Sequence, residues 1–168
     1  MHRLFIILTI LIVLHSCASQ QVAERSRSCE PVTAGEFLDD PFYFDLSIDS
    51  VQARFGKKIR LTRFLRNVGG GESKKDTIYR FHRNASSFVF YITSNGDESF
   101  LTSKIGDPAI EMRSCIRIGM PRIKVEEQIN GFPSDFRDTV DISNNRRQAV
   151  FVFEDSRLKQ VFINNYFR

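Results

Sequence analysis

Hydrophobic positions in the first half of the chain show a helical spacing. Val51 and Phe55 lie four positions apart, as do residues on one face of a helix. Ser47 suits the N-cap of this helix, and Gly56 suits its stop. The sequence therefore predicts a short amphipathic helix within residues 46–56.

The second half repeats this arrangement within residues 120–131. Val125 and Ile129 again lie four positions apart, and Pro121 precedes them where the first turn of a helix would begin. Gly131 is expected to end this helix. The two predicted helices thus carry similar start and stop signals.

Each predicted helix is followed by segments whose apolar residues alternate or cluster as in strands. These segments, rich in β-branched and aromatic residues, are 76–81, 88–92, 100–105, 138–142, 150–153 and 158–163. Polar residues at 94–97 and 154–156 indicate turns between strands. The shared order predicts an α+β fold made of two tandem repeats of helix plus antiparallel β-meander.

The second predicted helix and its ends resemble a family motif. The matching residues are Ile118, Gly119, Met120, Val125, Ile129, Gly131 and Pro133. They resemble the SmpA/OmlA family of small barrel-assembly lipoproteins, and the tandem order resembles the β-lactamase-inhibitor-protein fold. Pro121 stands where the family has Ser or Thr, and Asn130 adds one residue before the Gly-x-Pro. The resemblance implies a fold whose members act by binding proteins.

The N-terminus has the layout of a secretory signal. Arg3 precedes an apolar run over residues 4–14, which is too short to span a bilayer. Leu14-His15-Ser16-Cys17 resembles the bacterial lipobox, although His15 departs from the usual small or apolar residue. The resemblance implies lipidation of Cys17 and removal of the residues before it. The alternative is an ordinary signal peptide in which this cysteine is incidental.

The same interpretation leaves the other two of the three cysteines to be explained. If Cys17 carries lipid, Cys29 and Cys115 remain as a pair in an oxidising compartment, and we expect a disulfide between them. The alternative is two free buried thiols.

These patterns divide the chain into four expected segments. They are a lipoprotein signal peptide at 1–16, the lipidated cysteine and a flexible tether at 17–29, a first helix-plus-sheet repeat at 30–114, and a second at 115–168. The residue after Cys17 is Ala18, and not the aspartate that would resemble an inner-membrane retention signal. We therefore expect a cell-envelope protein, anchored through its N-terminal lipid in the outer membrane and facing the periplasm.

Candidate catalytic chemistry is sparse. His82 would be the one histidine left after the signal is removed, and no nucleophile motif accompanies it. The acid pairs Asp39-Asp40 and Glu126-Glu127 lack the clustering of a metal site. Gly69-Gly70-Gly71 lacks the Lys-Ser/Thr of a phosphate loop, and the net charge of +4 is too mild to indicate nucleic acid. We expect no enzyme activity, no cofactor, no metal, no nucleic acid and no small-molecule substrate.

One window concentrates positive charge. Its cations are Lys57, Lys58, Arg60, Arg63 and Arg66, and they alternate with apolar residues. One interpretation is a surface that faces anions, either lipid head groups or an acidic partner. The other, which the nearby acids Glu72 and Asp76 favour, is a solvated strand or helix whose apolar residues face the core.

Three triplets resemble a bacterial O-glycosylation signal of Asp, then Ser or Thr, then an aliphatic residue. Their acceptors are Ser50, Thr77 and Thr139, and the alternative is that these triplets belong to ordinary helix and strand starts.

The sequence as a whole predicts a non-catalytic protein-binding or scaffolding module with an envelope protein as its partner. Two alternatives stay open. One is an inhibitor of an extracytoplasmic hydrolase, with the loop at 67–75 as its inserting segment. The other is a lipid-handling protein, which would need a hydrophobic cavity between sheet and helices.

Overall fold

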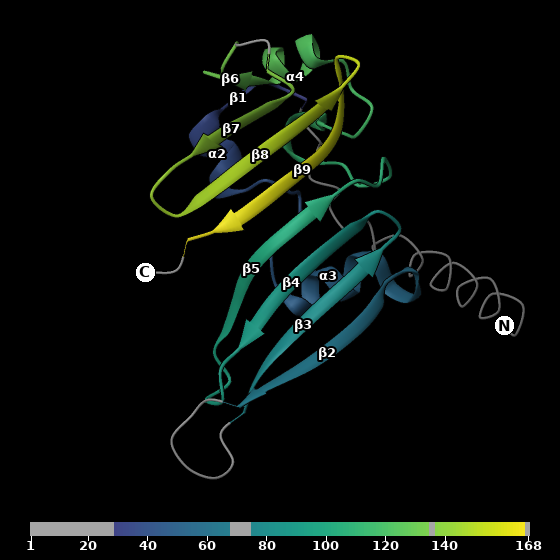
Figure 1. The fold of residues 1–168 in the computed structure, drawn as a ribbon, viewed down its shortest axis with the longest axis vertical. Helices are drawn as coiled ribbons and strands as arrows, with labels where there is room; N and C mark the ends of the chain where they lie inside the picture. The colour runs from purple at the N-terminus through teal and green to yellow at the C-terminus, as the bar shows by residue number, and fades with distance from the viewer. Residues whose placement is uncertain (1–28, 68–74, 135–136, 167–168) are drawn as a thin grey trace, which may run out of the picture.

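A computed structural model describes residues 29–67, 75–134 and 137–166. Its main element is one seven-stranded antiparallel sheet (Figure 1). In sheet order the strands are β2 (Arg60–Asn67), β3 (Lys75–Arg83), β4 (Ser86–Ile92), β5 (Glu98–Ile105), β9 (Arg157–Asn165), β8 (Arg147–Glu154) and β7 (Thr139–Ser143). A separate parallel pair joins β1 (Val32–Thr33) to β6 (Ile129–Asn130). The predicted α+β class is therefore confirmed.

The described chain also contains short helices, two of which cover the same face of this sheet. The helices are α2 (Ala34–Asp39), α3 (Ile48–Phe55), η1 (Gly56–Lys58), η2 (Arg113–Cys115) and α4 (Arg122–Gln128). The rings of Phe37 and Phe151 lie 5.6 Å apart, so α2 covers β8. The rings of Phe55 and Phe88 lie 5.7 Å apart, so α3 covers β4. Figure 1 shows both helices behind the strands. In the described part, no helix has the length and apolar character needed to cross a bilayer.

The helix α3 forms where local signals predict it. The Ser47 hydroxyl accepts a hydrogen bond from the Ser50 amide at 3.2 Å, which caps the first turn. Gly56 ends the helix with a φ of 51°, a conformation that favours glycine. Val51 and Phe55 are buried on its inner face. The predicted helix within 46–56 is confirmed.

The predicted end of the second helix is wrong. The helix α4 stops at Gln128, before Gly131, and Pro121 occupies the N-cap position. Ile129 leaves the helical conformation because it enters β6 and pairs with Val32 of β1. Gly131 instead follows that strand with a φ of 82°. A pairing with a distant segment therefore overrides the local stop signal.

Five of the six predicted strand segments lie wholly within strands of the structure, the sixth (138–142) begins one residue before β7, and all six belong to one sheet. The seam is the antiparallel pairing of β5 with β9, in which Thr102 pairs with Asn164 and Ile105 pairs with Val161. Side chains from both halves enter a single hydrophobic cluster. The core is rich in phenylalanine, and among the described residues ten rings are buried: Phe37, Phe42, Phe55, Phe81, Phe88, Phe90, Phe100, Phe132, Phe151 and Phe153.

The predicted cysteine pairing is confirmed. Cys29 and Cys115 form a disulfide with their Cα atoms 5.1 Å apart. A hydrogen bond of 2.8 Å from the Ser114 hydroxyl to the Glu30 carbonyl oxygen lies beside it. The start of the described chain is thereby fixed to η2, where the second half begins.

Candidate functional site

The strand β2 lies at one end of the main sheet. It pairs with β3 along its whole length, from Arg60 opposite His82 to Asn67 opposite Lys75. Within the described ranges no strand pairs with its other side. An edge strand presents backbone N–H and C=O groups that can pair with a further strand. Among the described residues, this edge of β2 is therefore unpaired.

The predicted basic window forms this edge and the turn before it. Lys57 and Lys58 are exposed in η1, and Arg60, Arg63 and Arg66 are exposed along β2. We name these five cations, together with Leu61, Phe64 and Leu65, the basic edge surface. It brings all five predicted patch residues together.

The window forms a solvated strand, as one interpretation predicted, but three of its apolar residues are largely exposed rather than buried in the core. Leu61, Phe64 and Leu65 are 42%, 47% and 57% exposed. Only Ile59, just before the strand, packs partly against the core. The reason is the position of α3, which packs over β4 and leaves β2 at the sheet edge. Exposed large apolar side chains of this kind often mark an interaction surface.

The cations of the basic edge surface keep their charge unpaired within the part of the chain that the structure describes. None of the ion pairs found there includes any of the five. The guanidinium of Arg63 instead lies over the Tyr79 ring, 5.8 Å from its centroid. Within these residues the five positive charges therefore have no ion-pair partner.

Asp76 is paired in register with Arg66, but among the described residues it forms no ion pair with any of the five cations. Its carboxylate is buried and accepts hydrogen bonds from the Tyr91 hydroxyl and, at 2.8 Å, from the Ser94 amide. The carboxylate is therefore held inside the fold by neutral donors, and a partial offset of the charge by Asp76 stays a prediction. Glu72, the other acid expected to contribute, lies outside the described residues.

Two residues that sequence analysis did not assign to the surface join it from β3. Arg80 pairs across from Thr62, and its guanidinium lies 5.8 Å from the centroid of the Phe64 ring. His82 pairs across from Arg60. Burial, then the charges of Arg80 and Arg60, lower the pKa of His82. The alternation of side chains along residues 78–82 was the signal that could have placed both on one face.

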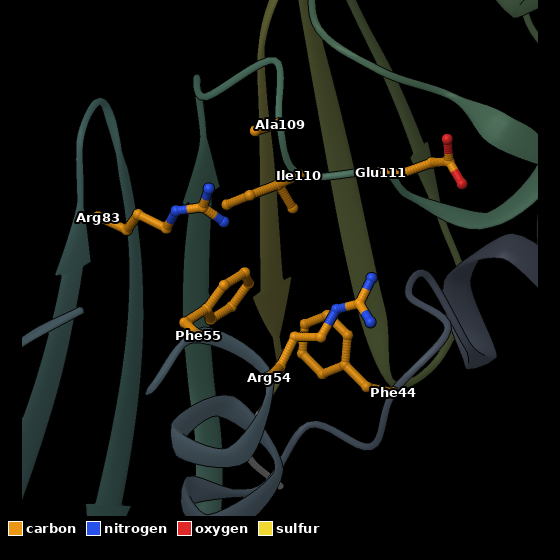
Figure 2. Close-up of a pocket in the computed structure, with 7 residues that line it drawn as sticks. All are labelled: Phe44, Arg54, Phe55, Arg83, Ala109, Ile110 and Glu111. Atoms are coloured by element: carbon orange, nitrogen blue, oxygen red, sulfur yellow. The ribbon is translucent and has the colours of Figure 1, made fainter. Parts of the chain in front are cut away.

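A second candidate is a small pocket beside α3, with a volume of about 180 Å³ (Figure 2). Arg54 and Arg83 lie on two sides of Phe55, and Glu111 lies at the margin. Arg83 is already paired with the Asp107 carboxylate at 3.3 Å, and Glu111 lies 3.7 Å from Arg117. The pocket is therefore small and nearly balanced in charge, which makes it weaker than the basic edge surface.

The remaining predicted site residues are scattered. Cys17 and the triple glycine lie outside the described residues. Ser50 is half-buried in α3, Thr77 is buried in β3, and Thr139 is exposed at the start of β7. Burial of Thr77 argues against its modification in the folded domain.

Among the residues that the structure describes, no three His, Cys, Asp or Glu side chains gather as a metal site would require.

Comparison of the chain with protein-family models, curated proteins and solved structures found no match. The function is therefore inferred from the chemistry of the basic edge surface. Guanidinium groups pair with carboxylates or phosphates. The open strand edge offers backbone hydrogen bonds, and its exposed Leu and Phe side chains offer apolar area. This combination suits the binding of another molecule.

Proposed function

We propose that the chain is a non-catalytic protein-binding or scaffolding module, held in the bacterial envelope by lipid on Cys17. The observation that carries the proposal is the basic edge surface, where large apolar side chains are exposed among cations with no ion-pair partner in the described residues. Protein interfaces are enriched in arginine and in aromatic side chains. A partner protein would bury both kinds of group at once.

The proposed architecture is a tandem repeat that resembles the β-lactamase-inhibitor-protein fold. A register shift occurs between Val89 and Phe90 in the first half. A second shift occurs between Val152 and Phe153, again just before a buried phenylalanine in the penultimate strand of its half. In both halves a helix precedes the strands. These paired features support two copies joined at the β5–β9 seam.

The proposed location is the outer membrane, with the domain facing the periplasm. The disulfide between Cys29 and Cys115 supports export, because disulfides persist in oxidising compartments. Lipid on Cys17 would place the anchor close in sequence to this disulfide. The folded domain would then stay near the membrane while its basic edge surface remains available.

The filling of the interior favours a surface-binding protein over a lipid carrier. The rings of Phe42 and Phe88 lie 5.6 Å apart, and those of Phe44 and Phe55 lie 5.8 Å apart. These rings occupy the space between α3 and the sheet, where a lipid cavity would have to lie. The loop proposed for an inhibitor falls mostly at 68–74, outside the described residues.

The test is a chemical crosslinking pull-down from envelopes with tagged full-length protein. We expect a stoichiometric protein partner, whose recovery falls in a Cys17→Ala variant because the protein no longer lies at the membrane. Crosslinks should map to the basic edge surface. Recovery of bound lipid without any protein partner would contradict the proposal and favour lipid handling. Recovery of a hydrolase that the purified protein inhibits would favour the inhibitor.

A further inference from the structure

The two ends of the seven-stranded sheet are not equivalent. β7 has five residues, and α2 packs against it. β2 has eight residues, and its side chains are almost all exposed. In the described part of the chain, β2 is the longer and less covered edge, which is the usual place for strand addition.

The exposed apolar residues of β2 divide between the two faces of the sheet. Leu61 pairs with the buried Phe81, so it points to the helix-covered face, and Leu65 lies on the same face by alternation. Phe64 points to the opposite face. A flat membrane would meet only one of these faces. A strand lying beside β2 would contact both, because cross-strand neighbours pair on each face.

The charge of the strand restricts what can lie beside it. A second copy of β2 would bring the cations Arg60, Arg63 and Arg66 close to their own equivalents, and opposed like charges destabilise strand pairs. Basic side chains on an edge strand are a known protection against such self-pairing. An acidic strand would meet the same cations favourably, because opposite charges across strands stabilise the pair.

We propose that the free edge of β2 accepts an extended acidic segment of a partner protein as an eighth strand. This inference rests on the proposed function and specifies how the partner binds. The segment carries a carboxylate at every third position, so that its carboxylates lie opposite Arg60 and Arg66 on one face and opposite Arg63 on the other, with apolar or β-branched residues between them. Its carboxylates pair with Arg60, Arg63 and Arg66, and its apolar residues cover Leu61, Phe64 and Leu65. Its backbone supplies the hydrogen bonds that the edge lacks.

The test uses purified full-length protein and a fluorescent eight-residue peptide in which glutamate occupies every third position and valine or threonine occupies the others. We expect saturable binding by fluorescence anisotropy that weakens at high salt. The triple variant Arg60→Glu, Arg63→Glu and Arg66→Glu should weaken binding by more than about tenfold. The same variant should gain binding to a peptide with lysine in place of glutamate. Arg146→Glu, an exposed charge reversal between β7 and β8, is the matched control and should change nothing.

Backbone pairing is tested with a peptide whose central residue is proline, which lacks an N–H and cannot pair as a strand. We expect it to bind at least about tenfold more weakly than the parent peptide. Hydrogen exchange should slow in β2 on binding and stay unchanged in β7. Equal affinity for the proline peptide, or protection away from β2, would overturn the inference.

Two further arms separate the competing occupants. In the first arm, the Cys17→Ala protein is mixed with phosphatidylglycerol vesicles. If it binds them, loses this binding in the triple variant and does not bind the acidic peptide, the inference is overturned in favour of a membrane surface. A concentration-dependent dimer lost in the same variant would overturn it in favour of self-pairing. A pull-down partner crosslinked elsewhere would overturn the strand inference while leaving the proposed function standing.

Discussion

Asp107 shows how one buried carboxylate organises a turn. It is 4% exposed and accepts hydrogen bonds from the Asn84 side chain at 2.8 Å and the Ala109 amide at 2.9 Å. The Nε atom of Arg83 lies 3.3 Å away, while the same guanidinium lies over the Phe55 ring. The carboxylate thus links the β3–β4 turn to the segment after β5 and to α3.

We predict that Asp107→Asn lowers the free energy of unfolding by about 2–4 kcal/mol, because it removes the charge that pairs with a nearly buried Arg83. Urea denaturation measures the change. Asp45→Asn, at an exposed acid, is the matched control and should stay within about 0.5 kcal/mol of the wild type. Equal effects of the two substitutions would show that the pairing contributes nothing specific.

Two buried serines are predicted to respond in opposite directions. Ser103, 1% exposed beside the β5–β9 seam, has no hydrogen-bond partner for its hydroxyl among the described residues. The Ser86 hydroxyl accepts hydrogen bonds from the amides of Gly106 and Asp107, both at 2.9 Å. Ser103→Ala should leave the free energy of unfolding unchanged or raise it by about 1 kcal/mol, whereas Ser86→Ala should lower it by about 1–3 kcal/mol.

Urea denaturation of the two serine variants side by side provides the check. A clear loss of stability in Ser103→Ala would mean that its hydroxyl has a partner in solution.

At the scale of elements, the helices differ in how far their local signals reach. The start and end of α3 could be predicted because the Ser47 cap and Gly56 act within a single turn. The end of α4 could not, because it depends on pairing between β6 and β1, whose residues lie far apart in sequence. The helix α2 was missed, although Thr33 and Glu36 have the spacing of a capping box.

The candidate site was predictable in composition but not in orientation. The five cations were recognisable as a group, and the structure does place them on one edge. Their apolar neighbours were assigned to the core because alternation alone does not reveal which strand lies at an edge. The β5–β9 seam was equally hidden, since the pairing of two distant strands leaves no local pattern.

The capping box of α2 predicts a pH dependence. Hydrogen bonds from the Thr33 amide at 2.7 Å and the Thr33 hydroxyl at 2.8 Å lower the pKa of Glu36. A carboxyl whose pKa is lower in the folded state adds stability above its unfolded pKa, and this is lost as the pH falls through the folded pKa. The loss should begin near the ordinary glutamate pKa of about 4.3 and continue below it.

We predict that Glu36→Gln flattens this acid dependence, because glutamine keeps the capping geometry but does not titrate. The free energy of unfolding, measured from neutral pH down to about pH 3, should fall less steeply in the variant than in the wild type. Parallel slopes for the two proteins would show that Glu36 titrates alike in the folded and unfolded chain.

At the scale of the whole molecule, both halves share one sheet and one hydrophobic cluster. The disulfide between Cys29 and Cys115 closes a loop across 86 positions of sequence. In the chain-entropy account, closing a loop of this length stabilises the folded state by about 4 kcal/mol, because it restricts the unfolded chain.

We predict that the double variant Cys29→Ser and Cys115→Ser loses about 4 kcal/mol of unfolding free energy and keeps a single cooperative transition. Chemical denaturation, with reduced wild-type protein as the matched comparison, measures the loss. Hydrogen exchange should show β3 and β8 losing protection together. Separate transitions for these strands would show that the halves fold as independent units.

The same disulfide sets the path of mechanical load through the protein. A force applied before Cys29 and resisted at the C-terminal end reaches Cys115 directly through the covalent bond. The stretch between the two cysteines, with β2 to β5, is then a closed loop that this force cannot extend. Along the covalent backbone only the segment after Cys115 bears the tension, and β5 receives force only through its pairing with β9. A module pulled by its anchor would therefore keep the backbone between its cysteines, the basic edge surface included, outside the covalent load path.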